Sequence, residues 1–409
     1  MKLYGTKVLL LLTLLSVIAP ACGRRASNRQ DMGTYGFDKD FFASRGIEVI
    51  ELTSCDGCSR VLVAPLYQGR VMTSTTGGEK GVSYGWINHE AISSGEINPQ
   101  FNPYGGEERF WIGPEGGPFS FYFKPGEEQI YANWDVPKVI DTEPFEVVSK
   151  GERKAEFARK ASLANASGVR FDMGLSRSVE LLDTEQACAL LGIEAPEGVS
   201  LMAYRTSNRI TNEGTQAWTK ATGLPSIWLL GCFNPTPTTT VFIPYDRSAN
   251  KVVNDEYFGK VPADRLKVED GIIYFRIDGR YRAKIGLPAG SAAGLCGSYD
   301  SARHILNILK YNVPQPPCDY VNGQWGPQED SFNGDVINSY NDGPTETGTI
   351  MGPFYEIETS SPGASLQPGE TLLHEQCTFH IEGDEASLDA IVRKVFGIPL
   401  ACVTSVFGQ

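Results

Sequence analysis

The clearest candidates for chemistry are two glutamates in the segment "FYEIETSSP", Glu356 and Glu358, which alternate with apolar residues. Strand alternation places such side chains on the same face, about 7 Å apart. A carboxylate there can act as a general base. The spacing also falls within the roughly 6.5–9.5 Å between the carboxyls of inverting glycosidases, although neighbours on one strand seldom straddle a glycosidic bond. A solvated strand face is the alternative for both residues.

Histidines could supply the acid of a proton relay. In "LLHEQCTFHI", His374 and His380 alternate with Gln376 and Thr378, so both are expected on one face of a return strand that pairs with the glutamate strand. His304 is expected on a strand that follows a turn. We take His304 and His374 as candidate catalytic residues and His380 as a candidate binding residue. A hydrogen-bonded histidine on a half-buried sheet face is the alternative for each.

A second chemically rich segment is "GGEERFWIGPEGGPFSFYF", residues 105–123. It predicts a hairpin with strands at 106–112 and 118–124 around a turn at 113–116, where Pro and Gly suit a type I turn. The phenylalanines of the second strand are expected in the core. The hairpin predicts one wall of a binding cleft with four candidate residues: Glu107, Arg109, Trp111 and Glu115.

Other polar and aromatic side chains complete the candidate site. The apolar face of a pyranose stacks on Trp or Tyr, while carboxylates, amides and cations bind its hydroxyls. The run 320–344 is dense in Asn, Asp and aromatic residues, as expected of a loop that lines a sugar site. The further candidates are Arg282, Lys284, Trp325, Tyr340, Asn341 and Asp342. Core packing and cross-strand ion pairing are the alternatives.

The same run offers a metal alternative. Asp330, Asp335 and Asp342 supply the oxygens that calcium prefers, but their spacing matches no EF-hand loop. We therefore expect no cofactor, with calcium as the weaker alternative.

Composition favours a strand-rich globular protein. The chain has 409 residues with 44 Gly, 25 Pro and a formal net charge of −13. Such a negative chain is poorly suited to nucleic acid, which calls for a basic patch. Short strands with no fixed repeat indicate one continuous β domain. Two helices are predicted, one capped by Asp183 and ending before Gly192, and one from Asp384 to Gly397 that packs on the sheet.

The N-terminus resembles an export signal. Lys2 and Lys7 precede an apolar run from Val8 to Ile18, and Ala19-Pro20-Ala21 then precedes Cys22. Small residues before a cysteine are typical of bacterial lipoproteins, although the same residues also suit ordinary signal peptidase. We expect lipidation of Cys22, a signal peptide at 1–22, a tether at 23–44, a β domain at 45–398 and a C-terminal tail at 399–409. This predicts an exported protein anchored in the cell envelope through its lipid.

Three segments together resemble the galactose mutarotase-like (aldose 1-epimerase-like) superfamily: "GGEERFWIGPEGG", "TNEGTQAW" at 211–218, and "FYEIETSSP" followed by "LQPGE". Within it they look most like a group of uncharacterised bacterial lipoproteins. The resemblance implies an all-β fold, an antiparallel β-supersandwich with few short helices, whose concave face binds carbohydrate. It also implies that Glu356 or Glu358 is a general base. The histidine that the family carries has no counterpart in "LPSIWLLGCFNP", residues 224–235.

These observations predict a monomeric, exported carbohydrate-binding lipoprotein that acts in sugar processing. Two alternatives stay open. One is an active aldose 1-epimerase that uses a strand glutamate as base and an unconventional acid. The other is a structural or interaction lipoprotein without a small-molecule site.

Overall fold

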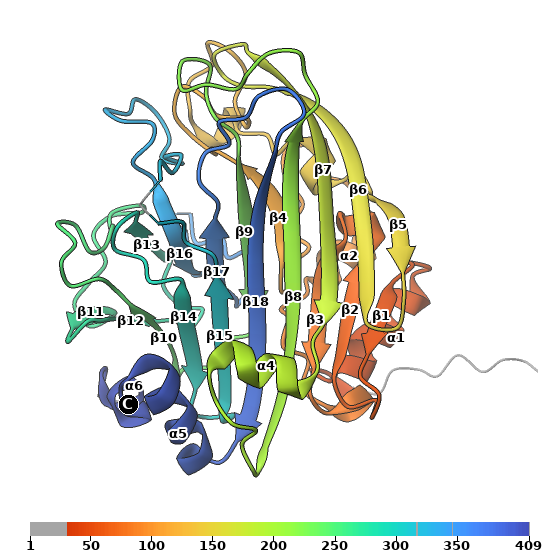
Figure 1. Cartoon of the computed structure of the whole chain (residues 1–409), viewed down its shortest axis with the longest axis vertical. Coiled ribbons are helices and arrows are strands. Elements are labelled where there is room, and N and C mark those ends of the chain that lie inside the picture. The colour runs from red at the N-terminus through yellow and green to blue at the C-terminus, as the bar shows by residue number, and fades with distance from the viewer. Residues whose placement is uncertain (1–30, 316–317, 346, 409) are drawn as a thin grey trace, which may run out of the picture.

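The computed structural model describes residues 31–315, 318–345 and 347–408. Within these ranges the protein is mainly β, with two facing antiparallel sheets and a small third sheet (Figure 1). No helix of this described part is long and apolar enough to cross a membrane. The predicted signal peptide, with Cys22 at its end, lies outside the described residues.

The larger sheet of the described chain has ten strands in the order β11-β12-β10-β14-β15-β18-β8-β7-β6-β5. Its strands are β5 (Glu146–Lys150), β6 (Lys154–Ala164), β7 (Arg170–Leu181), β8 (Val199–Asn212), β10 (Thr239–Pro244), β11 (Leu266–Glu269), β12 (Ile272–Arg276), β14 (Leu295–Asp300), β15 (Ile305–Tyr311) and β18 (Thr371–Gly383).

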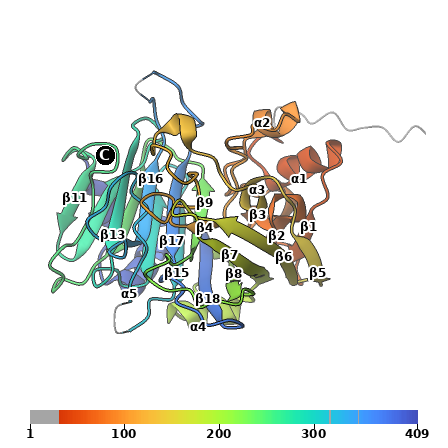
Figure 2. The same cartoon turned by 90° about the horizontal axis from the view of Figure 1, so that it is seen from above.

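The smaller sheet covers one face of the larger one and has the order β13-β16-β17-β9-β4. Its strands are β4 (Arg109–Gly113), β9 (Ser226–Phe233), β13 (Ala283–Pro288), β16 (Asp335–Asn341) and β17 (Tyr355–Ser360). Seen from above, β4, β9, β17 and β16 form one layer and β15, β18, β8 and β7 the other (Figure 2). The central strand β17 carries Glu356 and Glu358, as the alternation predicts.

The predicted pairing of the glutamate strand with the histidine strand is wrong. Strand β17 pairs with β16 and β9, whereas β18 pairs with β15 and β8 in the other sheet. Residues 361–370 therefore carry the chain from one sheet to the other. Alternation is a property of each strand alone, so it placed the side chains correctly without indicating the partner strands.

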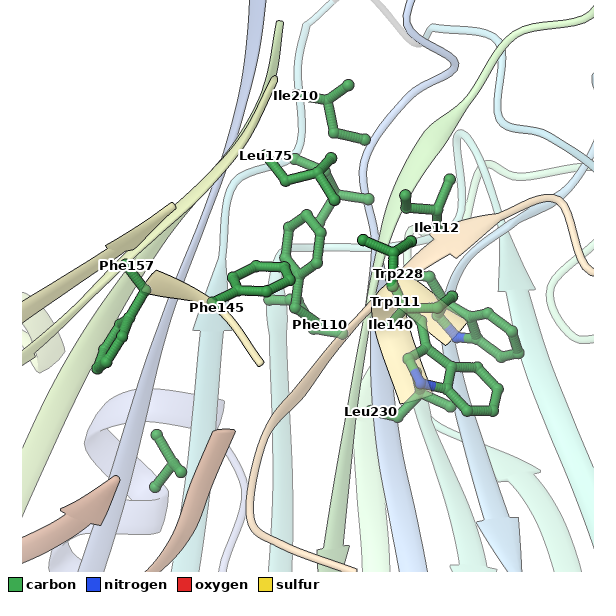
Figure 3. Packing of buried hydrophobic residues seen from close by; sticks show 14 of the residues in the cluster. Phe110, Trp111, Ile112, Ile140, Phe145, Phe157, Leu175, Ile210, Trp228 and Leu230 are labelled. Carbon is green, nitrogen blue, oxygen red and sulfur yellow. The ribbon is translucent and has the colours of Figure 1, made fainter. Parts of the chain in front are cut away.

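The second half of the predicted 105–123 hairpin is also wrong, because residues 118–124 form turns and bends instead of a strand. Strand β4 pairs with β9, and after Gly113 the chain turns back through bonds such as Phe121 N–H to the Pro114 carbonyl. Phe121 and Phe123 are nevertheless buried in the core, as expected. Figure 3 shows Phe110 on one side of β4 with Phe145 and Leu175, and Trp111 on the other with Trp228.

Both predicted helices are present. Helix α4 (Thr184–Leu191) has Asp183 in a capping box with Gln186, and α5 (Glu385–Phe396) runs from its cap at Asp384 to Gly397. Helix α6 (Leu400–Ser405) follows with Leu400 and Val403 buried, so the predicted C-terminal tail is wrong for these residues. All three helices pack in one cluster on the outer face of the larger sheet.

The predicted tether is also wrong over residues 35–44, which form helix α1 (Tyr35–Ser44). Buried Tyr35 and Phe42 pack with residues of the third sheet, which comprises β1 (Ile50–Thr53), β2 (Arg60–Ala64) and β3 (Arg70–Thr75). Helix α1 is thus stabilised by tertiary packing of its aromatic residues. Two short helices, α2 (His89–Ser94) and α3 (Lys138–Asp141), complete this flank (Figure 2).

Candidate functional site

The outward face of the smaller sheet gathers polar side chains from all five of its strands. On β17, Tyr355 and Ile357 pack in the core between the sheets, so Glu356 and Glu358 point the other way. Register places Glu358 beside Leu230 of β9, which lies opposite Arg109 of β4. We call this side of the smaller sheet the outward face; Glu356 and Glu358 are both buried there.

Glu356 is held by two neighbours on the outward face. Its Oε1 lies 2.6 Å from Nη2 of Arg109 and 3.1 Å from Sγ of Cys232. Burial raises the pKa of the Glu356 carboxyl, and the guanidinium of Arg109 opposes that rise. Glu356 is therefore a positioned ion-pair partner of Arg109.

Glu358 has a different pair of partners. Its Oε2 accepts hydrogen bonds from Nζ of Lys284 at 2.8 Å and from Nε1 of Trp228 at 2.9 Å. Burial lowers the pKa of Lys284, but Glu358 and Glu115 raise it by more, so the ammonium group stays charged. Oε2 of Glu358 thus accepts both of these hydrogen bonds, and Oε1 accepts neither of them.

Glu115 reaches the same cluster from the loop after β4. Burial is the main cause that raises the pKa of the Glu115 carboxyl to about 7, and the like charge of Glu358 raises it further. The ammonium group of Lys284 and the indole N–H groups of Trp325 and Trp134 oppose this rise. The side chain of Glu115 is only partly accessible to solvent. A carboxyl that is half protonated near neutral pH beside a second carboxyl is the arrangement from which acid and base roles arise.

Aromatic rings border this cluster. Trp325 is 37% exposed and lies 6.1 Å from the ring of Trp134 and 5.1 Å from that of Phe123. It is therefore free to stack on a ligand. Trp111, in contrast, is buried under the guanidinium of Arg109, whose centre lies 4.4 Å from its ring, so it supports the site from beneath.

The remaining predicted binding residues divide between two faces. Tyr340 lies next to Glu356 in register and donates to Asp342 at 2.9 Å. Arg282 interacts electrostatically with both and covers the ring of Phe258 at 3.7 Å. Asn341 points away from the outward face and bonds to Asp278 and the Tyr281 carbonyl, where it holds a turn.

The structure does not bring the candidate histidines or Glu107 to this face. His374 and His380 are buried between the sheets, His374 against Thr359 at 2.9 Å and His380 against Glu107 at 3.1 Å. Burial lowers the pKa of His374 to about 3.

Glu107 precedes β4 and follows Gly106, which has a φ of 106°, so simple alternation with Arg109 fails there. His304 lies on the exposed turn before β15, rather than on the predicted strand.

Several residues of the outward face escaped prediction. Trp228, Leu230 and Cys232 belong to "SIWLLGCF", where every residue is buried and no alternation distinguishes the two faces. Trp134 and Tyr257 lie in loops, for which spacing gives no direction. Only knowledge that β9 pairs with β17 would have identified the β9 residues.

No group of three or more His, Cys, Asp or Glu side chains is arranged to hold a metal ion in the described part of the chain. Asp335 accepts from Tyr257 and Asn254, and Asp342 from Tyr340 and the Gly352 N–H. The two side chains are thus engaged in separate hydrogen-bond groups.

Comparison with known proteins agrees with this architecture. The fold is an antiparallel β-sandwich of the kind that the sequence resemblance implies. The chain belongs to a family of unknown function, DUF6786, whose model matches residues 33–407. No curated protein sequence matches it.

Two similar solved structures illustrate the likeness. The Slr1438 protein from Synechocystis sp. PCC 6803 has 13% identity and a TM-score of 0.50, over 83% of this chain and 96% of that one. A galactose mutarotase-like protein from Lactobacillus casei ATCC 334 has 10% identity and a TM-score of 0.45, over 82% of this chain and 99% of that one. At these identities the likeness concerns the fold alone.

Proposed function

We propose that this protein binds a carbohydrate on the outward face of the smaller sheet. The observation that carries the proposal is the convergence of Glu115, Glu358 and Lys284 beside the exposed ring of Trp325. Fixed carboxylates and an ammonium group suit the hydroxyls of a sugar, and an indole suits its apolar face. The fold is consistent with this role but does not determine it.

Calorimetric titration with neutral hexoses, uronic acids and short oligosaccharides tests this proposal. Saturable binding to at least one of these sugars is expected. No binding across the whole panel would favour the alternative of an interaction protein without a small-molecule site.

One observation favours catalysis at the same place. Mutarotation needs a base that removes the proton of the anomeric hydroxyl and an acid that protonates the ring oxygen as the bond from C1 to that oxygen breaks. Glu358 is the candidate base, and Glu115, with a pKa of about 7, is the candidate acid in place of the absent histidine. Ring closure on the other face of the aldehyde, with both protons returned, gives the other anomer.

The proposed location is the cell envelope, with the lipid on Cys22 as anchor. If so, Cys22→Ser should abolish incorporation of labelled palmitate and move the protein from the membrane fraction to the soluble fraction. Cys402→Ser is the matched control, because Cys402 is an exposed cysteine far along the chain. Equal labelling of the Cys22→Ser variant and the parent would contradict lipidation at this residue.

A further inference from the structure

A cavity of about 610 Å³ opens next to the outward face. It lies between residues 246–257, the turn at 288–290 and parts of the run 322–335. Its volume is within the roughly 300–1,000 Å³ of pockets that hold small organic ligands. Five side-chain amides line it: Asn250, Asn254, Asn322, Gln324 and Asn333.

The charge of this cavity favours a neutral ligand. Its ionisable lining groups include the carboxyls of Asp246 and Asp335 and the ammonium group of Lys251. Burial raises the pKa of Asp335, and Tyr257 donates a hydrogen bond to its carboxyl. Amides that both donate and accept match sugar hydroxyls, which do the same. The lining has no cluster of cations of the kind that selects phosphate or a polyanion.

Tyr257 connects this cavity to the outward face. The tyrosine lines the cavity, while its ring lies 5.3 Å from Nζ of Lys284, the partner of Glu358. Its hydroxyl accepts from Asn338 at 3.1 Å, and Asn338 lies beside Glu358 in register. Lys284 and Tyr257 therefore link Glu358 to the lining of the cavity.

Two further contacts join the two regions. A Cβ on Gly286 would lie 1.9 Å from Oδ2 of Asp335 and 2.4 Å from Nδ2 of Asn338, so glycine at this position leaves room for both polar groups.

On the other side of the cavity, Gln324 of the cavity lining precedes Trp325 of the outward face in the chain. The backbone there also lies against the Glu115 loop, since a Cβ on Gly116 would lie 2.3 Å from the Gln324 carbonyl.

We propose that this cavity is a second sugar subsite, and that the ligand is a neutral oligosaccharide with one unit on the outward face and the next against Tyr257 and the amides. The inference rests on the proposed carbohydrate binding and specifies the ligand class. A free hexose would occupy only the outward face. The second unit would gain hydrogen bonds from these amides, of which Asn254, Asn322 and Asn333 are already held by side-chain hydrogen bonds.

Titration of the parent protein with neutral mono-, di- and trisaccharides of one series tests this inference. Disaccharide is expected to bind about tenfold more tightly than monosaccharide, a gain of about 1.4 kcal/mol. The double variant Asn250→Ala, Gln324→Ala should lose that gain and keep monosaccharide affinity within about twofold. Both residues are exposed, so the fold should tolerate their truncation.

Two controls make the outcomes distinct. Gln367→Ala removes an exposed amide outside the cavity and should leave both affinities unchanged. Ser248→Trp, which places a bulky ring in the cavity lining, should repeat the loss. Equal affinity for all chain lengths in the parent would overturn the subsite and keep the proposed function. Absence of binding by every saccharide would overturn both.

Discussion

Replacing Arg177 by alanine is expected to lower the free energy of unfolding by about 3–5 kcal/mol, because it leaves a buried carboxylate without its partner. Nη2 of Arg177 lies 2.5 Å from Oε1 of Glu108, and both side chains are fully buried between the sheets. Burial raises the pKa of Glu108, and Arg177 opposes that rise. Urea denaturation at pH 7 measures the loss.

Arg170→Ala is the matched control for this prediction, since Arg170 lies on the same strand β7 and pairs with Asp172 at the surface, with side chains 69% and 47% exposed. Its cost should stay below about 1 kcal/mol. The double variant Arg177→Met, Glu108→Met should recover much of the stability, because it removes both charges and keeps apolar volume. A loss below about 1 kcal/mol for Arg177→Ala would contradict the role assigned to this pair.

The largest effect on activity is expected from Glu115→Gln. If the site catalyses mutarotation, loss of this acid should slow enzyme-catalysed anomer exchange by about 10²–10⁴-fold. The parent's rate should also fall as the pH rises through about 7, because the folded-state pKa of Glu115 is raised and its protonated form is lost there. The variant should lack that alkaline fall. Polarimetry on freshly dissolved α-sugars measures both.

Glu128→Gln serves as the control for Glu115, because Glu128 is an exposed glutamate in the segment that follows. It should change neither the rate nor the pH profile. A parent rate no better than buffer for every sugar tested would eliminate the catalytic candidate while leaving carbohydrate binding intact. If the rate of anomer exchange by Glu115→Gln still falls as the pH rises through about 7, the general acid is a group other than Glu115.

Local chemistry made much of this fold predictable. The caps at Asp183 and Asp384 define the starts of α4 and α5, and alternation puts Glu356 and Glu358 on one face, because these effects depend on residues close in sequence. The pairing of β17 with β9 depends on residues more than 100 positions apart, and no local pattern indicates it. That pairing is what brings Trp228 and Cys232 to the glutamates.

The same limit explains the errors at the candidate site. His380 lies on β18, whose alternation is readable, yet alternation does not say which face is outward in a two-sheet protein. Glu107 lies before β4, where the backbone at Gly106 breaks the alternation with Arg109. Glu115 and Trp325 are loop residues that tertiary packing alone brings together. Helix α1 was missed because its few buried residues are stabilised by the third sheet rather than by their own sequence.

The central claim is that carbohydrate binds on the outward face, and titration of the parent beside Trp325→Ala tests it most directly. Trp325 is exposed, so its loss should leave the fold intact while removing a stacking surface. We expect about tenfold weaker binding of the best saccharide by Trp325→Ala and no change for Phe37→Ala, a ring on α1 at the other flank. Parent-like affinity in Trp325→Ala, or equal losses in both variants, would contradict the assigned site.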